Sequence, residues 1–373
     1  MFIRSSVLAA CLAAASALAQ TGEPLDPASA LRFQLAPDSP LAVLATNLGD
    51  SRVETRGGAM VLDLRATLTL RNNSPKSVRG VTLLVLAQEL TAGGKGSVAV
   101  PSLNVAPGAS FPVRVNLRLL RPLPAPVGPL VQLGLDGVLF SDFSFFGPNR
   151  LESRRTMVVW EMEAQRDRQH FQAALAANGP EGLRQQILAS LARQQSRPRL
   201  EAQVNRAPTR ALSAAVSALT GKSVQLAVLK LPEAPLELVS ASSHVSGGEA
   251  HSPHIEYSNR SGRPVRHVEV GWLVRDAGGR EYLAGSVPAS AAPDGVYRFF
   301  QGREPLEGIS GMRGFLSQVE FSDGSVWIPA RRALADQGLL GLLPVSPEEQ
   351  RLSELYRTRG LQALVEELAR FLR

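Results

Sequence analysis

The sequence predicts a mainly β protein with α-helical parts, in which two antiparallel β-sandwiches are separated by a helical segment and followed by a C-terminal amphipathic helix. One observation is an internal repeat, because the stretch at 72–83, NNSPKSVRGVTL, returns at 259–270 as NRSGRPVRHVEV. Weaker echoes on both sides keep nearly the same spacing, which distinguishes a true repeat from chance resemblance. The other observation is periodicity: apolar and polar residues alternate around both copies, and helical spacing follows each copy.

Composition places the chain among folded globular proteins. It has 373 residues, of which 44% are hydrophobic and 20% charged, enough for two or three hydrophobic cores. The formal net charge is +7, and arginine is concentrated between Arg150 and Arg210. We expect these arginines to form the solvated face of helices, and we expect no nucleic-acid partner because the chain has few aromatic residues to stack on bases.

The N-terminus has the pattern of a secretory signal at 1–19. Arg4 precedes an apolar run, and Ala17-Leu18-Ala19 provides a small-residue cleavage site. The sequence therefore predicts export to the periplasm or the extracellular space, with cleavage after Ala19. The alternative is a lipoprotein that is anchored through Cys11. Cys11 is the single cysteine, so the cleaved chain is expected to have no disulfide, and the mature chain is expected not to span a membrane.

A predicted linker at 20–39 leads into the first sandwich, at 40–149. The linker is rich in Pro, Ala and Asp and has no clear period. Within the sandwich, the run from Met60 to Leu70 alternates strictly between apolar and other residues, as a half-buried strand does. Further short runs separated by turns favour an antiparallel sandwich.

The period changes to that of helices in a segment at 150–222. The first helix is expected to end at Asn178-Gly179, a pair that tolerates positive φ, and Pro180 is expected to open the second. A third helix is predicted from Leu212 to Leu219.

The second sandwich is predicted at 223–334, with Trp272 at the centre of its core. It contains two short motifs, Asn259-x-Ser261-Gly262 and Trp272-x-Val274-Arg275-Asp276-x-x-Gly279. With these motifs the chain resembles the FxLYD type of bacterial extracellular sandwich domain, with Trp, Val and Arg in place of Phe, Leu and Tyr. The resemblance implies tandem immunoglobulin-like folds. It carries over no functional residue, because such domains are not known for a shared active site.

The second sandwich closes with a predicted hairpin at Asp323-Gly324. A two-residue turn there sets Phe321 opposite Val326. This register leaves Trp327 on the face of the sheet that points away from the core.

An equivalent hairpin closes the first sandwich, where Phe143 stands in the place of Gly324. Because a bulky residue is strained at positive φ, we expect a different loop there. Phe146 corresponds to Trp327, and an aromatic side chain that points away from its core must be covered or must bind something. Phe146 and Trp327 are therefore the candidate interaction surface, the alternative being that the helices or the other sandwich cover them.

A second linker is predicted at 335–346, and an amphipathic helix at 347–373. Ser346 is expected to cap this helix, and Gly360 to interrupt it. Its apolar stripe is expected to pack on the central helical segment or on a sheet. The paired acids Glu348-Glu349 are expected on its solvated face.

The sequence predicts no catalytic residue, no cofactor site and no metal site. The strongest candidate is a group of four histidines, His244, His251, His254 and His267. Their spacing does not place a ligand set on one face of a strand, so we expect surface histidines.

The leading functional hypothesis is a non-catalytic interaction or structural module of the bacterial envelope or of the secreted proteins. Its partner is expected to be an envelope or extracellular protein or polymer. The alternative is an accessory protein that binds a carbohydrate or another polymer through an exposed Trp327. A third hypothesis, an enzyme with a site between the sandwiches, requires a cleft with converging titratable groups.

Overall fold

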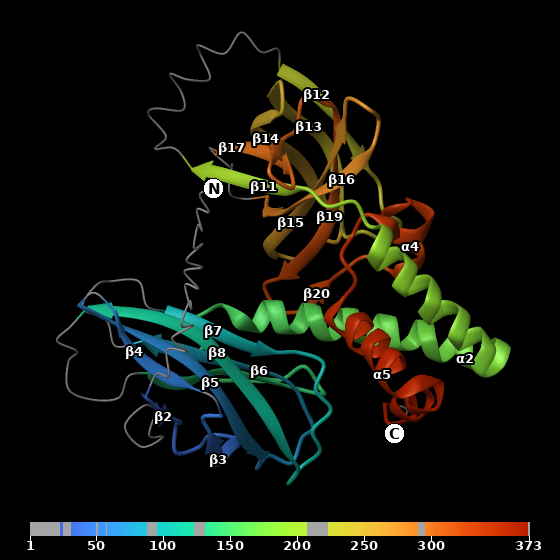
Figure 1. Ribbon diagram of the computed structural model, residues 1–373. Coiled ribbons are helices and arrows are strands. Elements are labelled where there is room, and N and C mark those ends of the chain that lie inside the picture. Colours follow the sequence, from blue (N-terminus) through green and yellow to red (C-terminus); the bar gives the residue numbers. More distant parts are fainter. Residues whose placement is uncertain are drawn as a thin grey trace, which may run out of the picture. The chain divides into compact units, whose positions relative to one another are not determined.

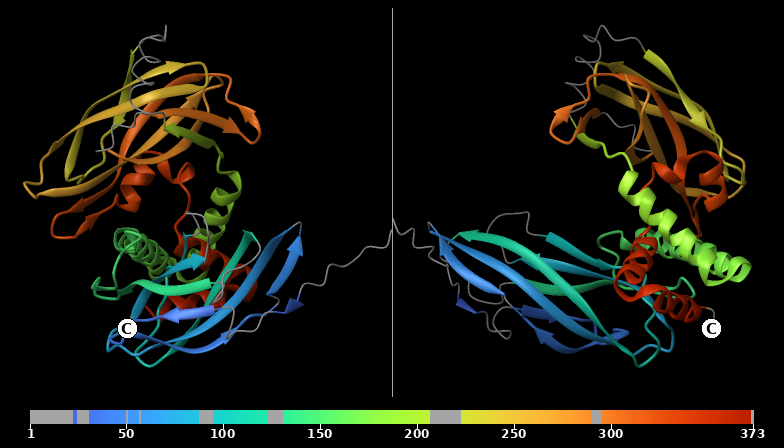
Figure 2. Two further views of the ribbon diagram at one scale, coloured as in Figure 1. Left: turned by 90° about the vertical axis from the view of Figure 1, so that its left-hand side faces the viewer. Right: turned by 45° about the vertical axis from the view of Figure 1, so that its right-hand side comes forward.

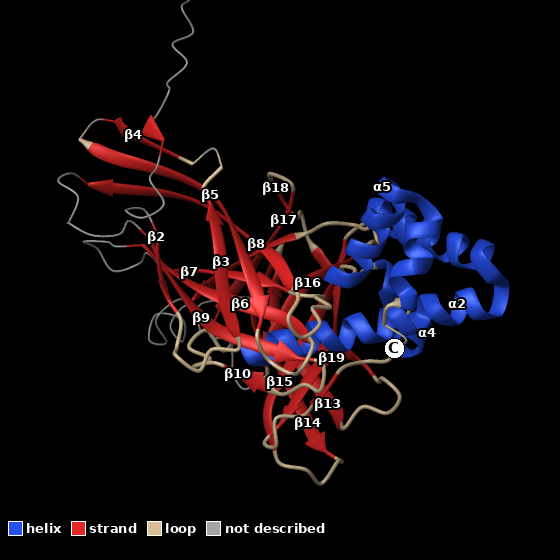
Figure 3. Cartoon of the chain, turned by 90° about the horizontal axis from the view of Figure 1, so that it is seen from below, coloured by secondary structure: helices blue, strands red, loops and turns tan. Residues whose placement is uncertain are grey.

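The computed structural model describes residues 23–24, 31–49, 51–56, 58–87, 95–122, 131–206, 223–289 and 295–371. Strands outweigh helices in this part of the chain, so the fold is mainly β with α-helical parts, as predicted (Figure 3). The predicted signal at 1–19, with Cys11, and the predicted helix from Leu212 to Leu219 lie outside the described residues.

The chain forms two compact units, each of which is described by itself. The first comprises the described residues up to Asn73 together with Leu83–Val98 and Gly108–Leu135. The second comprises Ser74–Thr82, Ala99–Pro107 and the described residues from Asp136 onward.

The first sheet is built around a long central strand. Its strands, in the order β1-β4-β5-β3 with β8 also on β5, are β1 (Glu23–Pro24), β4 (Arg52–Arg56), β5 (Ala59–Asn72), β3 (Leu41–Asn47) and β8 (Ser110–Pro122). The predicted alternation in β5 is confirmed, because Leu62, Leu64 and Leu68 are fully buried while Arg65 is exposed. Each buried leucine stabilises the fold by about 2 kcal/mol.

The second sheet has the order β10-β9-β6-β7, with β2 parallel to β9. Its strands are β10 (Phe145–Phe146), β9 (Val131–Phe140), β6 (Val78–Ala87), β7 (Lys95–Val100) and β2 (Leu31–Gln34). β2 lies in the stretch 20–39 that was expected to be a linker, so that expectation is wrong for these residues. Four residues are too few to show an alternation, and β2 is a strand because its backbone pairs with Val131–Gly134 far along the chain.

Ten strands form the sheets of the C-terminal β-region. They are β11 (Glu201–Arg206), β12 (Ser223–Leu229), β13 (Leu236–Ser246), β14 (Glu249–Asn259), β15 (Val265–Asp276), β16 (Glu281–Pro288), β17 (Gly295–Gln301), β18 (Glu304–Pro305), β19 (Ile309–Phe321) and β20 (Val326–Trp327). The order is β11-β17-β14-β13-β12-β19-β15-β16, with β18 on β17 and β20 on β19 (Figure 1). Trp272 is 3% exposed within the core, as predicted.

One strand of this region contradicts the expected helical segment at 150–222. Glu201–Arg206 forms β11, which pairs with β17 from Glu201↔Phe300 to Arg206↔Gly295. The partner lies far away in the sequence, so local periodicity gave no sign of the pairing.

Several strands at corresponding positions of the two predicted repeats have similar partners. β3, β5 and β8 are neighbours in one repeat, as β13, β14 and β17 are in the other. β9 has β6 and a parallel β2 beside it, as β19 has β15 and a parallel β12. The two regions differ in β4, which pairs with β5, and in β11, which pairs with β17. They also differ in β12, which pairs with β13 as well as with β19, whereas β2 pairs with β9 alone.

Helix α2 (Ser153–Ser196) is bent at Gly179, where φ is 64°, next to Pro180. The sequence pattern predicted the end of one helix and the start of another at this point. The start of α2 is fixed to β9, because the Ser153 hydroxyl donates to the buried Asp136 carboxylate at 2.6 Å.

Helix α5 (Pro347–Ala369) packs on α2, as predicted (Figure 2). Their shared core contains Phe171, Leu183, Ile187, Leu352, Leu364 and Leu368. Two further predictions are confirmed, because the Ser346 side chain accepts from the Glu349 N–H and the helix is bent at Gly360. No described helix combines the length and the apolar character needed to cross a membrane.

The expected linker at 335–346 is partly helical. Helix α4 (Arg331–Asp336) extends into it, and a 3₁₀-helix follows at Leu339–Gly341. Leu339 is fully buried with Phe315 of β19, and this contact holds the segment against the sheet.

Candidate functional site

The β19–β20 hairpin carries Trp327, and its loop has three residues. The Phe321 N–H donates to the Ser325 carbonyl at 2.9 Å, and the Gly324 N–H donates to the Phe321 carbonyl at 2.9 Å. Gly324 has a φ of 81°, as the last residue of such a loop requires. The predicted two-residue turn is therefore wrong.

The extra loop residue changes the face on which Trp327 lies. Trp327 is opposite Val319, and Val326 is opposite Glu320. Residues that are directly opposite each other share a face, and a slip of one residue moves a side chain to the other face. Trp327 therefore lies on the face of the buried Val319, where it is half-buried against the core, and not on the reverse face as predicted.

The first hairpin, β9–β10, has the same loop, which the sequence did not predict. The Phe140 N–H donates to the Ser144 carbonyl, and the Phe143 N–H donates to the Phe140 carbonyl, both at 3.0 Å. Phe143 adopts a φ of 62°, although this conformation is strained for a bulky residue. Its side chain packs on the cluster of Leu139 and Met157, and this packing offsets the strain.

An aspartate and a serine fix each loop. Asp142 accepts from the N–H and the hydroxyl of Ser144, at 3.0 and 2.5 Å. Asp323 accepts from the N–H and the hydroxyl of Ser325, at 2.9 and 2.7 Å.

A cation completes the carboxylate contacts in both loops. Lys76 lies 2.7 Å from Asp142, and Arg263 lies 2.8 Å from Asp323. The hydrogen bond from Lys76 is the main cause that lowers the pKa of Asp142. The hydrogen bonds from Ser325, followed by that from Arg263, lower the pKa of Asp323 to about 2.

A groove of about 510 Å³ lies between the β19–β20 hairpin and α2, and we call it the Trp327 groove. Its apolar side chains come from both hairpins and from α2: Phe143, Val158, Met162, Val326, Trp327 and Ile328. Its polar side chains are Gln165, Arg166, Gln169, Glu233 and Ser325. β20 lies beside α2, so the side chains of the hairpin and those of the helix line the same groove (Figure 1).

The Trp327 groove is suited to binding a chain that presents apolar and hydrogen-bonding groups. Its volume is within the range of ligand pockets, which combine an apolar lining with a few oriented polar groups. The amides of Gln165 and Gln169 both donate and accept hydrogen bonds. One N–H of Arg166 is already used, because it donates to the Pro329 carbonyl at 3.0 Å.

Phe146, the other candidate residue, does not line the Trp327 groove. It is opposite the buried Val138 and is half-buried on that face. The groove instead receives Phe143 from the first hairpin. Sequence reasoning missed Phe143, Met162 and Gln165, and the one available signal was that Val158, Met162 and Gln165 follow helical spacing.

Buried ion pairs join α2 and α5, which corrects the expectation that both helices present solvated charges. Arg168 is 4% exposed and lies 2.6 Å from Glu161 and 3.2 Å from Glu348. Glu348 is fully buried and also pairs with Arg351 at 2.9 Å. Buried and exposed charges look alike in a sequence, because charge pattern alone does not show which residues meet a partner.

A second group of ion pairs surrounds Glu349. This residue is 3% exposed and lies 2.6 Å from Arg193 and 2.9 Å from Arg331. Burial by itself raises the pKa of Glu349, but the hydrogen bonds and the charge of Arg331 outweigh it and hold this pKa below its usual value. Arg331 also pairs with the fully buried Asp167 at 2.8 Å.

The four clustered histidines are spread over β13, β14 and β15. His251 is buried, so the expectation of surface histidines is wrong for this residue, and burial lowers its pKa. His267 contacts Glu269 at 3.1 Å. Within the described ranges, no group of three or more His, Cys, Asp or Glu side chains is arranged to hold a metal ion.

Comparisons with known proteins place the chain in no family. No protein-family model matches the chain, and no curated protein matches it. A solved structure described as pT26-6p aligns with 88% of this chain and 72% of its own, at 10% identity and a TM-score of 0.15. A likeness at this level carries no argument about fold or function.

Proposed function

We propose that the chain is a non-catalytic binding module of the bacterial envelope or extracellular space, and that the Trp327 groove holds an extended segment of a partner protein. The observation that carries this proposal is the groove itself, which combines an aromatic and aliphatic floor with amide side chains. In this proposal the chain is exported by a signal that is cleaved after Ala19, or anchored through Cys11.

The proposed module consists of two immunoglobulin-like sandwiches of the FxLYD type, derived from one by internal duplication. The similar strand partners support a common origin of the two repeats. So do the two hairpin loops, in which the same backbone bonds and the same aspartate and serine contacts recur. In each loop the cation also lies over an aromatic ring, Lys76 over Phe140 and Arg263 over Phe321.

Two features favour a polypeptide as the occupant. Among the described strands, β20 pairs with β19 alone, so its outer edge has backbone groups that an extended peptide can pair with. The side chains of Met162 and Trp327 are adaptable and large, and such residues are common where a surface receives apolar side chains of a partner.

A glycan is the second candidate occupant. Trp327 beside Gln165 and Gln169 offers a ring face next to amide groups, and sugars present both apolar faces and hydroxyls. The two occupants require different probes.

Selection from a phage-displayed library of random dodecapeptides on the full chain tests the proposal. We expect selected peptides, measured as synthetic fluorescent peptides by anisotropy, to lose at least about tenfold in affinity with Trp327→Ala, which is about 1.4 kcal/mol. Gln169→Ala, at an exposed position, tests the rim without disturbing the core. Tyr257→Ala is the matched control, because Tyr257 is an exposed aromatic residue of β14 outside the groove.

Three outcomes decide between the alternatives. Loss of binding with Trp327→Ala and Gln169→Ala, but not with Tyr257→Ala, supports a peptide groove. Peptides that bind all variants equally overturn the assignment of the groove. Oligosaccharides on an array that bind in a Trp327-dependent manner, without any selected peptide, replace the polypeptide by a glycan.

A further inference from the structure

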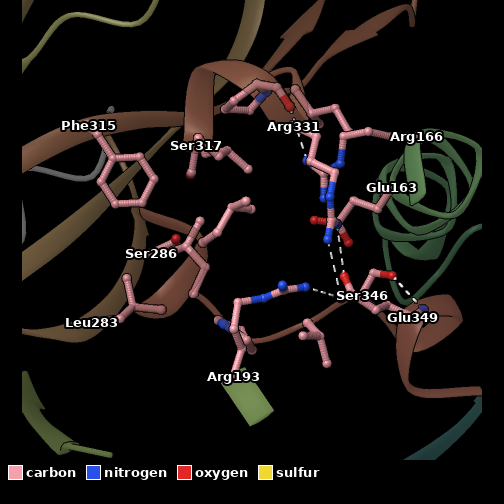
Figure 4. Close-up of a pocket in the computed structure, with 17 residues that line it drawn as sticks. Glu163, Arg166, Arg193, Leu283, Ser286, Phe315, Ser317, Arg331, Ser346 and Glu349 are labelled. Carbon is pink, nitrogen blue, oxygen red and sulfur yellow. Dashed lines mark hydrogen bonds and ion pairs between the residues drawn. The ribbon is translucent and has the colours of Figure 1, made fainter. Parts of the chain in front are cut away.

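A second cavity lies next to the Trp327 groove and shares Arg166, Ile328 and Pro329 with it. It has a volume of about 170 Å³, and we call it the Glu163 cavity (Figure 4). Ser286 of β16 is exposed and lies at its border. The cavity is therefore accessible to a small molecule from solvent.

One wall of the Glu163 cavity is apolar. It consists of Leu283, Phe315, Leu334, Leu340 and Leu343, from β16, β19, α4, the 3₁₀-helix and the residues just after it. Figure 4 shows Leu283 and Phe315 on the side of the cavity that faces away from the charged residues. An apolar cavity of about 150 Å³ holds a molecule of the size of benzene. The wall is thus large enough for the side chain of a small apolar ligand.

The opposite wall carries guanidinium groups with unused donors. Arg193 reaches across the cavity, and one of its five N–H groups donates to Glu349 at 2.6 Å (Figure 4). The Nε of Arg166 lies 3.5 Å from the buried Asp167 carboxylate, and its Nη1 donates to the Pro329 carbonyl at 3.0 Å. Its Nη2 group has no hydrogen-bond partner among the described residues and remains available as a donor. These groups lie where an incoming carboxylate would accept hydrogen bonds, because Arg–carboxylate bonds are strong and directional.

Glu163 is the one carboxyl group of this wall that is not used by the network. Glu349 is occupied by Arg193 and Arg331. No described residue forms a hydrogen bond with Glu163, and burial raises its pKa while the charge of Arg166 acts against that rise. Its carboxyl group points into the cavity beside the guanidinium groups (Figure 4).

We propose that the Glu163 cavity binds a small free amino acid with an apolar side chain, of about the size of leucine. The ammonium group of the ligand pairs with Glu163, and its carboxylate accepts from Arg166 and Arg193. The side chain lies against Phe315 and the leucines around it.

Neither simpler ligand satisfies both walls equally well. A monocarboxylate meets the guanidinium groups but leaves Glu163 facing a like charge, which is unfavourable in a partly buried site. An alkylamine pairs with Glu163 but faces the positive charges of Arg166 and Arg193. A zwitterion places each charge beside its opposite.

Isothermal titration of the full chain with three ligands of nearly equal shape tests the proposal. L-leucine carries both charges, 4-methylpentanoate lacks the ammonium group, and 3-methylbutylamine lacks the carboxylate. We expect L-leucine to bind at least about tenfold more tightly than either analogue, since each lost charge pair is worth 1.4 kcal/mol or more. Equal binding of 4-methylpentanoate, or no binding of L-leucine at 10 mM, overturns the proposal.

Glu163→Gln separates the ammonium contact from the rest of the site. The substitution keeps the shape and removes the charge, and burial already disfavours the charged form, so we expect the variant to fold with an unchanged melting temperature. L-leucine should lose at least about tenfold in affinity, whereas 4-methylpentanoate should bind as well as before or better. An unchanged affinity for L-leucine overturns the role of Glu163.

Gln169→Ala is the control that separates this site from the proposed peptide groove. Gln169 lines the Trp327 groove but not the Glu163 cavity and is exposed, so its replacement should leave the affinity for L-leucine unchanged. Trp327 cannot serve here, because it packs on the cluster of Phe315 and Leu334 that forms the apolar wall of the cavity. Loss of peptide binding together with retained L-leucine binding supports two independent sites. A parallel loss of L-leucine binding in this variant contradicts the assignment to the Glu163 cavity.

Discussion

The β9–β10 hairpin and the β19–β20 hairpin close their loops with the same hydrogen bonds, yet they differ at the residue with positive φ. That residue is Phe143, with a φ of 62°, in the first loop and Gly324, with a φ of 81°, in the second. Both loops keep an aspartate that accepts from the N–H and hydroxyl of the serine two positions later. The shared polar contacts therefore determine the conformation of the loop, and glycine at the positive-φ position only lowers its backbone strain.

The hairpins also differ in how their aromatic side chains are packed. In the first, Phe145 is packed toward α2, with Met157 and Val158. In the second, Val326 takes the place of Phe145, and Trp327, the counterpart of Phe146, packs against the core of its own sheet. The first hairpin therefore has an aromatic contact with the helix that the second lacks, and of the equivalent pair Phe146 and Trp327 only Trp327 lines the Trp327 groove.

The largest expected effect distinguishes the packing of the two hairpins. A Cβ atom at Gly137 would lie 2.3 Å from the Phe145 ring, so Gly137→Ala forces the ring or the strand to move. We expect a loss of about 2–3 kcal/mol in the free energy of unfolding, which urea denaturation followed by circular dichroism measures. An unfolding midpoint equal to that of the wild type contradicts the described position of the Phe145 ring.

Gln318 occupies the position equivalent to Gly137, because Val138 faces Phe146 as Val319 faces Trp327. The Gln318 side chain is 7% exposed, and its Nε2 has no hydrogen-bond partner within the described part of the chain. Gln318→Ala removes packing and also removes an unsatisfied polar atom, so the change should stay within about 1 kcal/mol. Gly137→Ala should therefore lower the free energy of unfolding more than Gln318→Ala does.

A smaller effect is expected at the positive-φ residue of each loop. Gly324→Ala should destabilise the protein by about 1 kcal/mol, since alanine is strained at a φ of 81°. In the first loop, Phe143→Gly should be more stable than Phe143→Ala by about the same amount. Phe143→Gly and Phe143→Ala both lack the ring, so this pair isolates the backbone. A Cβ atom at Gly324 also meets the Arg154 guanidinium, which must move aside in Gly324→Ala. A difference of opposite sign at either position would show that the loop changes its conformation.

Local features of the fold were predictable, and remote ones were not. The alternation in β5, the bends at Gly179 and Gly360 and the Ser346 cap depend on neighbouring residues, and all are confirmed. β2 and β11 depend on pairing with strands far along the chain, so no local pattern indicated them.

The candidate site was predictable only in part. Trp327 was identified from its place in the repeat, but its face was wrong, because the three-residue loop shifts the register by one. Met162 and Gln165 enter the groove through the packing of α2 on the hairpin, which the sequence does not encode locally. The buried Glu348 and Glu349 were taken for surface residues, because their arginine partners come from another helix.

The smallest expected effect concerns the charge of the loop aspartates. Lys76 is the main cause of the lowered pKa of Asp142, whereas Ser325 is the main cause for Asp323, with Arg263 acting after it. Lys76→Ala should therefore raise the pKa of Asp142 more than Arg263→Ala raises that of Asp323. Because both pKa values are lowered in the folded state, the aspartates stabilise it above about pH 4 and lose this contribution as the pH falls toward 2. Carboxyl chemical shifts followed by NMR during acid titration measure both pKa values, and a larger rise at Asp323 would reverse the assigned causes.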